Sequence, residues 1–216
     1  MSTSCPLRPR QFPPLLPADV LAWDGALLRI YSAAGPHGTV WSQLRTWGPV
    51  ASMRFDHHPP PPREHPVRAV GHLVAASTTA RPCDPLEVAV LERFQTGVID
   101  RHTDEPRLVL WQPTRPLGLL QLTDATWLAR AGGNAALLAG ARGRARLWSR
   151  ALYRAYPEID GLIWASSVLP PGRAVLLDER AADAVPTAPL SDRALREPAL
   201  QPALARIAAT YGMVLL

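Results

Sequence analysis

The apolar residues of this chain fall in short runs that prolines and polar turns interrupt. Such runs have the length of β-strands and are too short for most helices. They lie at 26–31, 52–56, 69–76, 107–111, 117–122, 160–166 and 174–178. Helical patterns lie among them without regular alternation, at 84–95, 125–130, 141–156 and 202–211. Because parallel sheets need a regular strand–helix alternation, this order predicts a mixed α+β domain instead.

Prolines mark the limits of that domain. Residues 1–18 are rich in proline and weakly patterned, which predicts a mobile or loosely docked N-terminal arm. Residues 19–216 are expected to form one domain, with a core at about 27–180 and a C-terminal extension at 181–216. The four consecutive prolines at 59–62 cannot feed a sheet ladder or a helix interior, so the chain should leave regular structure there.

The amino-acid composition limits the classes of function that we expect. The net charge of +5 invites a nucleic-acid interpretation, but all 23 basic residues are arginines and most are scattered, so no direct nucleic-acid binding is expected. The row Arg142, Arg144, Arg146, Arg150 and Arg154 has helical spacing and predicts a solvated helix face, with contact to an acidic partner as the alternative. No apolar window approaches the roughly 18 residues of a membrane span, and no signal peptide is recognisable, so we expect a cytoplasmic protein.

The segment 84–95 is expected to be a largely buried helix. Asp84 is placed to cap it, and Pro85 occupies the first helical position, where a missing N–H costs nothing. Two carboxylates, Glu87 and Glu92, lie inside its apolar run. Because a buried carboxylate is costly unless it is paired, one of them should have a function or a fixed partner. The alternative is that both lie on a solvated face beside Arg93.

Several kinds of site are not expected. The histidines at 57, 58, 65 and 72 crowd one region, but their spacing does not place two imidazoles on one helix face, so no metal site is predicted. Cys5 and Cys83 make neither a disulfide framework nor a zinc site. The chain also lacks a glycine-rich phosphate loop and the Gly-x-Ser-x-Gly pattern of serine hydrolases.

A scattered set of polar residues remains within the apolar runs. Its members are Arg29, Arg54, His72, Glu92 and Ser166. Each of them taken singly is more often structural. Together they supply what a glycosidic substrate bearing phosphates needs. Arginines bind phosphate through a fork of donors, and a carboxylate stabilises positive charge at an anomeric carbon. An imidazole packs on a heterocycle, and a hydroxyl fixes a polar edge.

The order and context of these residues resemble the RES domain, a bacterial toxin family named for its Arg, Glu and Ser. The matching segments are Leu-Leu-Arg29-Ile-Tyr, Met-Arg54-Phe-Asp-His-His, Gly-His72-Leu-Val-Ala, Val-Ala-Val-Leu-Glu92-Arg-Phe-Gln, Leu-Gly-Leu-Leu-Gln-Leu-Thr123 and Asp-Gly-Leu-Ile-Trp-Ala-Ser166-Ser. The resemblance runs from about residue 27 to residue 180, and it selects Glu92 over Glu87. His72 and Trp164 stand where the family usually has Tyr.

The resemblance implies a fold like that of ADP-ribosyltransferases, a split mixed sheet with flanking helices and an NAD-binding cleft. It implies a toxin that degrades NAD at the nicotinamide–ribose bond by phosphorolysis, with inorganic phosphate as co-substrate, or by hydrolysis. Catalysis is then expected from Arg54, Glu92 and Ser166, and NAD binding from Arg29, Arg54, His72 and Ser166, without a metal. ADP-ribosyl transfer to a protein and a non-catalytic binding module remain alternatives.

The same resemblance implies a partner. Toxins of this family are neutralised by a cognate antitoxin with an Xre-like helix-turn-helix domain, which supplies the DNA binding. A hetero-oligomer with that antitoxin, or a homo-oligomer, is therefore expected, and no membrane partner is.

Overall fold

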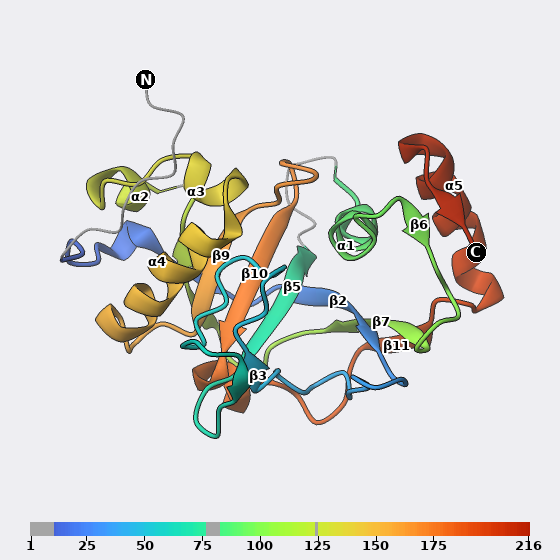
Figure 1. The fold of residues 1–216 in the computed structure, drawn as a ribbon, viewed down its shortest axis with the longest axis horizontal. Coiled ribbons are helices and arrows are strands. Elements are labelled where there is room, and N and C mark those ends of the chain that lie inside the picture. Colours follow the sequence, from blue (N-terminus) through green and yellow to red (C-terminus); the bar gives the residue numbers. More distant parts are fainter. Residues whose placement is uncertain (1–10, 77–82, 124) are drawn as a thin grey trace.

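An eight-stranded sheet forms the centre of the molecule (Figure 1). The computed structural model describes residues 11–76, 83–123 and 125–216. The strand order is β1-β8-β9-β10-β5-β2-β7-β11, in which β8 and β9 are parallel and the other neighbours are antiparallel. The strands are β1 (Val20–Trp23), β2 (Ala26–Ser32), β5 (Val70–Ala76), β7 (Pro106–Trp111), β8 (Leu117–Gln121), β9 (Gly161–Ala165), β10 (Arg173–Asp178) and β11 (Ser191–Ala194). The expected mixed α+β fold is confirmed.

Helices flank the sheet in two groups. In Figure 1, α2, α3 and α4 gather beside β9 and β10, whereas α1 and α5 lie toward β2 and β7. The helices are α1 (Pro85–Arg93), α2 (Trp127–Arg130), α3 (Ala136–Ala139), α4 (Arg142–Ala155) and α5 (Gln201–Tyr211), with 3-10 turns at Pro17–Asp19, Glu179–Ala184 and Pro198–Leu200. Two small ladders pair β3 (Trp47–Gly48) with β4 (Arg63–Glu64) and β6 (Val98–Ile99) with β12 (Val214–Leu215). No helix among the described residues is long and apolar enough to cross a bilayer.

Each group of helices buries its own part of the core. Trp127 and Trp148, from α2 and α4, are fully buried in the cluster that also holds Leu176 of β10. On the other side, Val90 of α1 lies in one cluster with Leu204 of α5, together with Ile99, Leu195, Ile207 and Ala208. Burying apolar side chains of this size contributes roughly 1.5–3 kcal/mol each. The helices are therefore fixed on the sheet by their apolar faces.

The sheet opens between β2 and β5. These strands pair only over Ala26–Leu28 and Val74–Ala76, and from Arg29 onward β2 continues beside β7 alone. Strand β5 meanwhile stays paired with β10 from Val70 to Val74. Helix α1 contacts both β2 and β5 over this opening. The split expected in the sheet is thus present, and it creates a cleft beneath α1.

The predicted elements mostly match the observed ones. Strands at 26–31, 69–76, 107–111, 117–122, 160–166 and 174–178 are confirmed within two residues, as are the helices at 84–95, 141–156 and 202–211. The short helix at 125–130 is observed as Trp127–Arg130. No side chain among the described residues caps its start; Thr123, just before it in the chain, accepts the Ala165 N–H instead.

The strand predicted at 52–56 is wrong. This segment forms a turn and a bend, and Phe55 has a φ of 57°. A strand needs φ well below zero, so the left-handed conformation of Phe55 interrupts the extended backbone. The aromatic residue that suggested a strand is instead fully buried and packs edge-on against Trp164, with ring centroids 4.9 Å apart.

Candidate active site

The cleft at the opening of the sheet is strongly cationic. Its volume is about 370 Å³, and four arginines and one carboxylate line it, namely Arg29, Arg54, Arg93, Arg142 and Glu92. A volume in this range is typical of small-molecule sites. The surplus of arginines suits an anionic ligand, because the guanidinium group matches phosphate and carboxylate geometry.

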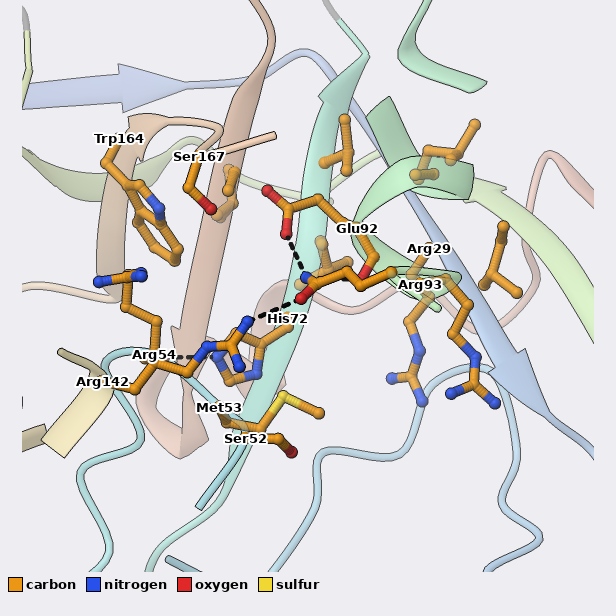
Figure 2. Close-up of a pocket in the computed structure, with 18 of the residues that line it drawn as sticks. Arg29, Ser52, Met53, Arg54, His72, Glu92, Arg93, Arg142, Trp164 and Ser167 are labelled. Atoms are coloured by element: carbon orange, nitrogen blue, oxygen red, sulfur yellow. Dashed lines mark hydrogen bonds between the residues drawn. The ribbon is translucent and has the colours of Figure 1, made fainter. Parts of the chain in front are cut away.

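Glu92 occupies the middle of the cleft. Figure 2 shows it reaching from α1 across β5, with Arg29 and Arg93 drawn on one side and Trp164 and Ser167 on the other. Helix α1 begins where Asp84 accepts the Leu86 N–H at 2.9 Å, with Pro85 at the first position, as predicted. The carboxylate therefore projects from the last turn of a helix that is fixed at its start.

Ser166 holds that carboxylate. Its Oγ accepts the N–H groups of Val168 and Leu169 at 3.3 and 3.2 Å and donates to Glu92 Oε1 at 2.6 Å. A hydroxyl has one proton, so with its lone pairs engaged by the amides that proton points at Glu92. Ser166 is only 1% exposed and lies behind the cleft, whereas its neighbour Ser167 lines the wall. The structure thus brings Ser166 and Glu92 together, with the serine touching the carboxylate instead of the cavity.

Glu87 has a different environment. It lies in the first turn of α1, as expected, and binds the Arg206 guanidinium and the Tyr211 hydroxyl of α5. It is absent from the cleft lining. Of the two carboxylates on α1, Glu92 alone faces the cleft.

Arg29 lies at the opening between β2 and β5. It donates to the Gln43 carbonyl at 3.0 Å and lies over the Tyr31 ring, 5.6 Å from its centroid. Burial lowers the pKa of Arg29 to about 10, which still leaves the group charged at neutral pH. No carboxylate of the described part of the chain forms an ion pair with it. A desolvated cation of this kind favours an anion that enters the cleft.

Arg54 and His72 are joined through the backbone. Burial lowers the pKa of His72 below its ordinary value, so the ring is neutral near pH 7. A neutral imidazole bonded to a carbonyl must donate, so the 2.8 Å contact between Nε2 and the Arg54 carbonyl assigns the proton to Nε2. The Arg54 side chain lines the cleft and also donates to the carbonyls of Leu137 and Gly140 at 3.2 and 3.0 Å. Arg54 therefore fixes the end of α3 as well as facing the cleft.

The loop that carries Arg54 is pinned by a buried carboxylate. Asp56 accepts from Arg45, from the Val50 N–H and from both the backbone and the ring of His58. Burial alone would raise the pKa of Asp56, but these hydrogen bonds hold it far below its usual range. Asp56 is fully buried and ionised, so the loop has little freedom to move.

The histidines clustered at 57, 58 and 65 also make structural contacts within the protein. His58 and His65 bond the carbonyls of Arg68 and Gly48, and His57 stacks on Tyr153 with ring centroids 4.3 Å apart. Within the ranges that the structure describes, no three His, Cys, Asp or Glu side chains are arranged to hold a metal ion.

Sequence reasoning missed several residues of the cleft wall as site residues, among them Arg93, Arg142, Trp164 and Ser167. Arg142 donates to Gln95 Oε1 at 2.7 Å, and Gln95 in turn donates to the Glu92 carbonyl at 3.2 Å. Arg142 also lines an adjoining hollow of about 610 Å³ at the start of α4. Its place at the head of the arginine row was the signal available, since that row begins where α4 meets the cleft.

The fold is therefore a split mixed sheet, and its candidate site is a cationic cleft with one central carboxylate. The chain shares its fold with a chain of the crystal structure of the M. tuberculosis MbcT–MbcA toxin–antitoxin complex. The two superpose with a TM-score of 0.53 at 14% sequence identity, over 87% of this chain and 92% of the other. No protein-family model matches the sequence, and no curated protein does. At this identity the similarity establishes the fold.

Proposed function

We propose that this chain is the toxin of a toxin–antitoxin pair and that it degrades NAD at the nicotinamide–ribose bond. The observation that carries the proposal is Glu92, a single carboxylate held at 2.6 Å by Ser166 Oγ in a cleft whose other charged residues are four arginines. Cleavage of an N-glycosidic bond in a dinucleotide needs both features. Cations hold the diphosphate, and an anion stabilises the positive charge that develops at the anomeric carbon.

In the proposed reaction, the C–N bond to nicotinamide breaks and its electron pair leaves with the ring, which departs as neutral nicotinamide. The ribose carbon becomes oxocarbenium-like, and Glu92 lies close to it as the stabilising charge. Water or inorganic phosphate then forms the new C–O bond, giving ADP-ribose or its 1″-phosphate. Arg29 and Arg54 bind the phosphates or ribose hydroxyls, and His72 packs on a ring.

The partner in this proposal is an antitoxin. Support comes from the shared fold, because the similar chain was crystallised in a complex named as toxin–antitoxin. We infer that an antitoxin carrying an Xre-like helix-turn-helix domain neutralises this chain and supplies DNA binding. Coexpression with such a neighbouring gene product should restore growth that the chain alone arrests.

The first experiment incubates purified protein with NAD in the presence and absence of phosphate and measures nicotinamide release. Glu92→Gln should lower the rate at least about 100-fold, because it removes the stabilising charge from the transition state. Glu87→Gln is the matched control on the same helix, since Glu87 faces α5 instead of the cleft. Induced expression of the wild type should arrest growth, and expression of Glu92→Gln should not.

The products separate the competing reactions. ADP-ribose 1″-phosphate formed only with phosphate identifies phosphorolysis, and free ADP-ribose identifies hydrolysis. Label from NAD that becomes fixed on protein identifies ADP-ribosyl transfer and overturns NAD degradation as the main activity. Unchanged NAD together with normal growth identifies a non-catalytic binding module.

A further inference from the structure

Helix α4 carries four arginines along one ridge that turns gradually around the helix. Arg142, Arg146, Arg150 and Arg154 follow one another at intervals of four residues. On a helix this spacing places neighbours about 6 Å apart along one ridge, so the row is about 18 Å long. Trp148 and Leu152 occupy the opposite, buried side. The row begins at the cleft, because Arg142 lines both the cleft and the adjoining hollow.

No carboxylate among the described residues forms an ion pair with this row; the nearby buried Asp56 acts on Arg150 only at longer range. Arg142 and Arg146 donate to uncharged oxygens, those of the Gln95 side chain and of the Ala51 and Met53 carbonyls. In the part of the chain that the structure describes, none of the four arginines forms an ion pair, although twelve other ion pairs are present. Like charges at this spacing destabilise a helix by roughly 0.2–0.5 kcal/mol per pair. Arg142 and Arg146 contribute to the fold through their hydrogen bonds, whereas in the described chain no hydrogen bond or ion pair of Arg150 or Arg154 explains the other half of the row.

The neighbourhood of the row is cationic as well. Burial lowers the pKa of Arg150, and the nearby charges of Arg146 and Arg154 lower it further, while Asp56 offsets part of this effect. Arg68 and Arg180 both lie against the Tyr153 ring, on which His57 also stacks, with their guanidinium carbons 4.4 and 4.0 Å from the ring centroid. Opposing charge from outside the chain would relieve this repulsion.

The surface suits a protein segment better than a nucleic acid. Single-stranded nucleic acids are bound by arginines together with exposed aromatic rings on which the bases stack. Here Trp148 is fully buried, and Tyr153 is covered by arginines. The exposed nonpolar side chain on the helix is Leu147, 41% exposed, which lies near the azimuth of Arg154. An acidic segment with interspersed apolar residues would satisfy both the arginines and this leucine.

We propose that the α4 arginine row is a docking surface for an acidic, amphipathic segment of another protein. The proposal is independent of the reaction in the cleft, since Arg150 and Arg154 do not line the cavity. The segment would lie along α4, with carboxylates facing the guanidinium groups and an apolar side chain on Leu147.

The test measures binding of a fluorescein-labelled peptide of repeated Glu-Glu-Leu-Glu units to the full chain by fluorescence anisotropy, at low and at physiological salt. The double variant Arg150→Gln/Arg154→Gln should weaken binding about three- to tenfold, which two exposed ion pairs are typically worth. Arg144→Gln is the matched control, because Arg144 lies on the same helix but off the ridge, and it should change the affinity less than twofold. NAD breakdown should be the same in all of these proteins.

Three results would overturn the proposal. The first is equal affinity for the acidic peptide and for the same peptide with Gln in place of Glu. The second is an equal loss in Arg144→Gln and in the double variant, which would indicate attraction by overall charge alone. The third is tighter binding of a labelled single-stranded oligonucleotide than of the peptide, with loss of this binding in the double variant. That result would identify the row as a nucleic-acid-binding surface.

Discussion

Ser166 and Ser167 follow β9 side by side and have different surroundings. Ser166 is buried and bonds Glu92, whereas Ser167 lines the cleft. The first is placed to orient the carboxylate, and the second is placed to touch a ligand. Kinetics of single substitutions can separate these roles.

Ser166→Ala should lower kcat for nicotinamide release about tenfold to a hundredfold, because a hydrogen bond to a charged group contributes roughly 1.5–3 kcal/mol. KM for NAD should change little, since Ser166 is not part of the cavity wall. Ser167→Ala should instead raise KM with a smaller effect on kcat. A raised KM with normal kcat in Ser166→Ala would show that Ser166 binds the substrate itself.

Asp178, at the end of β10, gives the protein a pH-dependent stability. Burial raises the pKa of Asp178 to about 7, and the neighbouring Arg180 only partly offsets this. The pKa of Asp178 in the folded protein lies above its unfolded value of 3.8. The contribution of this group to stability is therefore greatest below about pH 4 and is lost as the pH rises to about 7.

Asp178→Asn should therefore stabilise the protein more at pH 8 than at pH 5, by about 2 kcal/mol. Urea unfolding of both proteins at the two pH values measures this difference. Other titrating groups, such as His57 and His72, are common to both proteins and cancel. An equal effect at the two pH values would mean that Asp178 is already ionised at pH 5.

Some residues of the candidate site could be predicted from the sequence, and others could not. Glu92 was selected by the order of the neighbouring motifs, since helical geometry alone left Glu87 and Glu92 equivalent. The structure separates them through Arg206, more than a hundred residues away, which draws Glu87 to α5. The burial of Ser166 and the exposure of Ser167 depend on how the chain turns after β9. Sequence pattern does not encode that turn.

Helix α2 and helix α4 are joined by the N-terminal segment. Phe12 packs on Trp127, Trp148 and Tyr156, with ring centroids 5.5 to 6.0 Å apart. The Tyr156 hydroxyl also donates to the Pro13 carbonyl. The part of the predicted arm that the structure describes thus contacts the core.

Phe12→Ala should lower the free energy of unfolding by about 2–3 kcal/mol, less than for a fully buried phenylalanine because Phe12 is half-buried. Leu16→Ala is the control, since Leu16 is 46% exposed, and should change stability by at most about 0.5 kcal/mol. Urea unfolding measures both. Equal stability of wild type and Phe12→Ala would show that the arm is not docked in solution.

The sequence pattern predicted those helices and strands in which apolar residues recur at regular spacing and a turn or a proline marks the end of the element. The edge strand β11 has little apolar signal, because its sequence is Ser-Asp-Arg-Ala, and the edge strand β1 is apolar but only four residues long. Strand β11 is fixed by pairing with β7 and by Asp192, which binds Tyr31 and Arg107. Such partners are distant in sequence and cannot be found by a local pattern.

The C-terminal segment supports the helix that carries Glu92. Leu204 and Ile207 of α5 are fully buried in the cluster that holds Val90 of α1. Leu204→Ala should therefore cost about 2–4 kcal/mol of unfolding free energy. Leu190→Ala, at a position that is 63% exposed, should cost less than about 0.5 kcal/mol. A small effect of Leu204→Ala in urea unfolding would mean that α5 is dispensable.

The order of the strands in the sheet cannot be predicted from local sequence patterns. The strands at 107–111 and 117–122 are joined by a short turn, yet β9, β10, β5 and β2 separate them in the sheet. The pairing that determines this order joins residues far apart in the chain, such as Leu27 with Trp111 and Val74 with Ala174.

The position of β10 has a consequence for the synthesis of the protein. β10 alone connects the half-sheet β1-β8-β9 to the half-sheet β5-β2-β7, and it is made only when residues 173–178 leave the ribosome. Until then His72 and Trp164 belong to two unconnected sheets, so the cleft between them does not exist. Folding that depends on such late, long-range pairing is slow. The cleft therefore cannot form before residues 173–178 have been synthesised and have paired with both half-sheets.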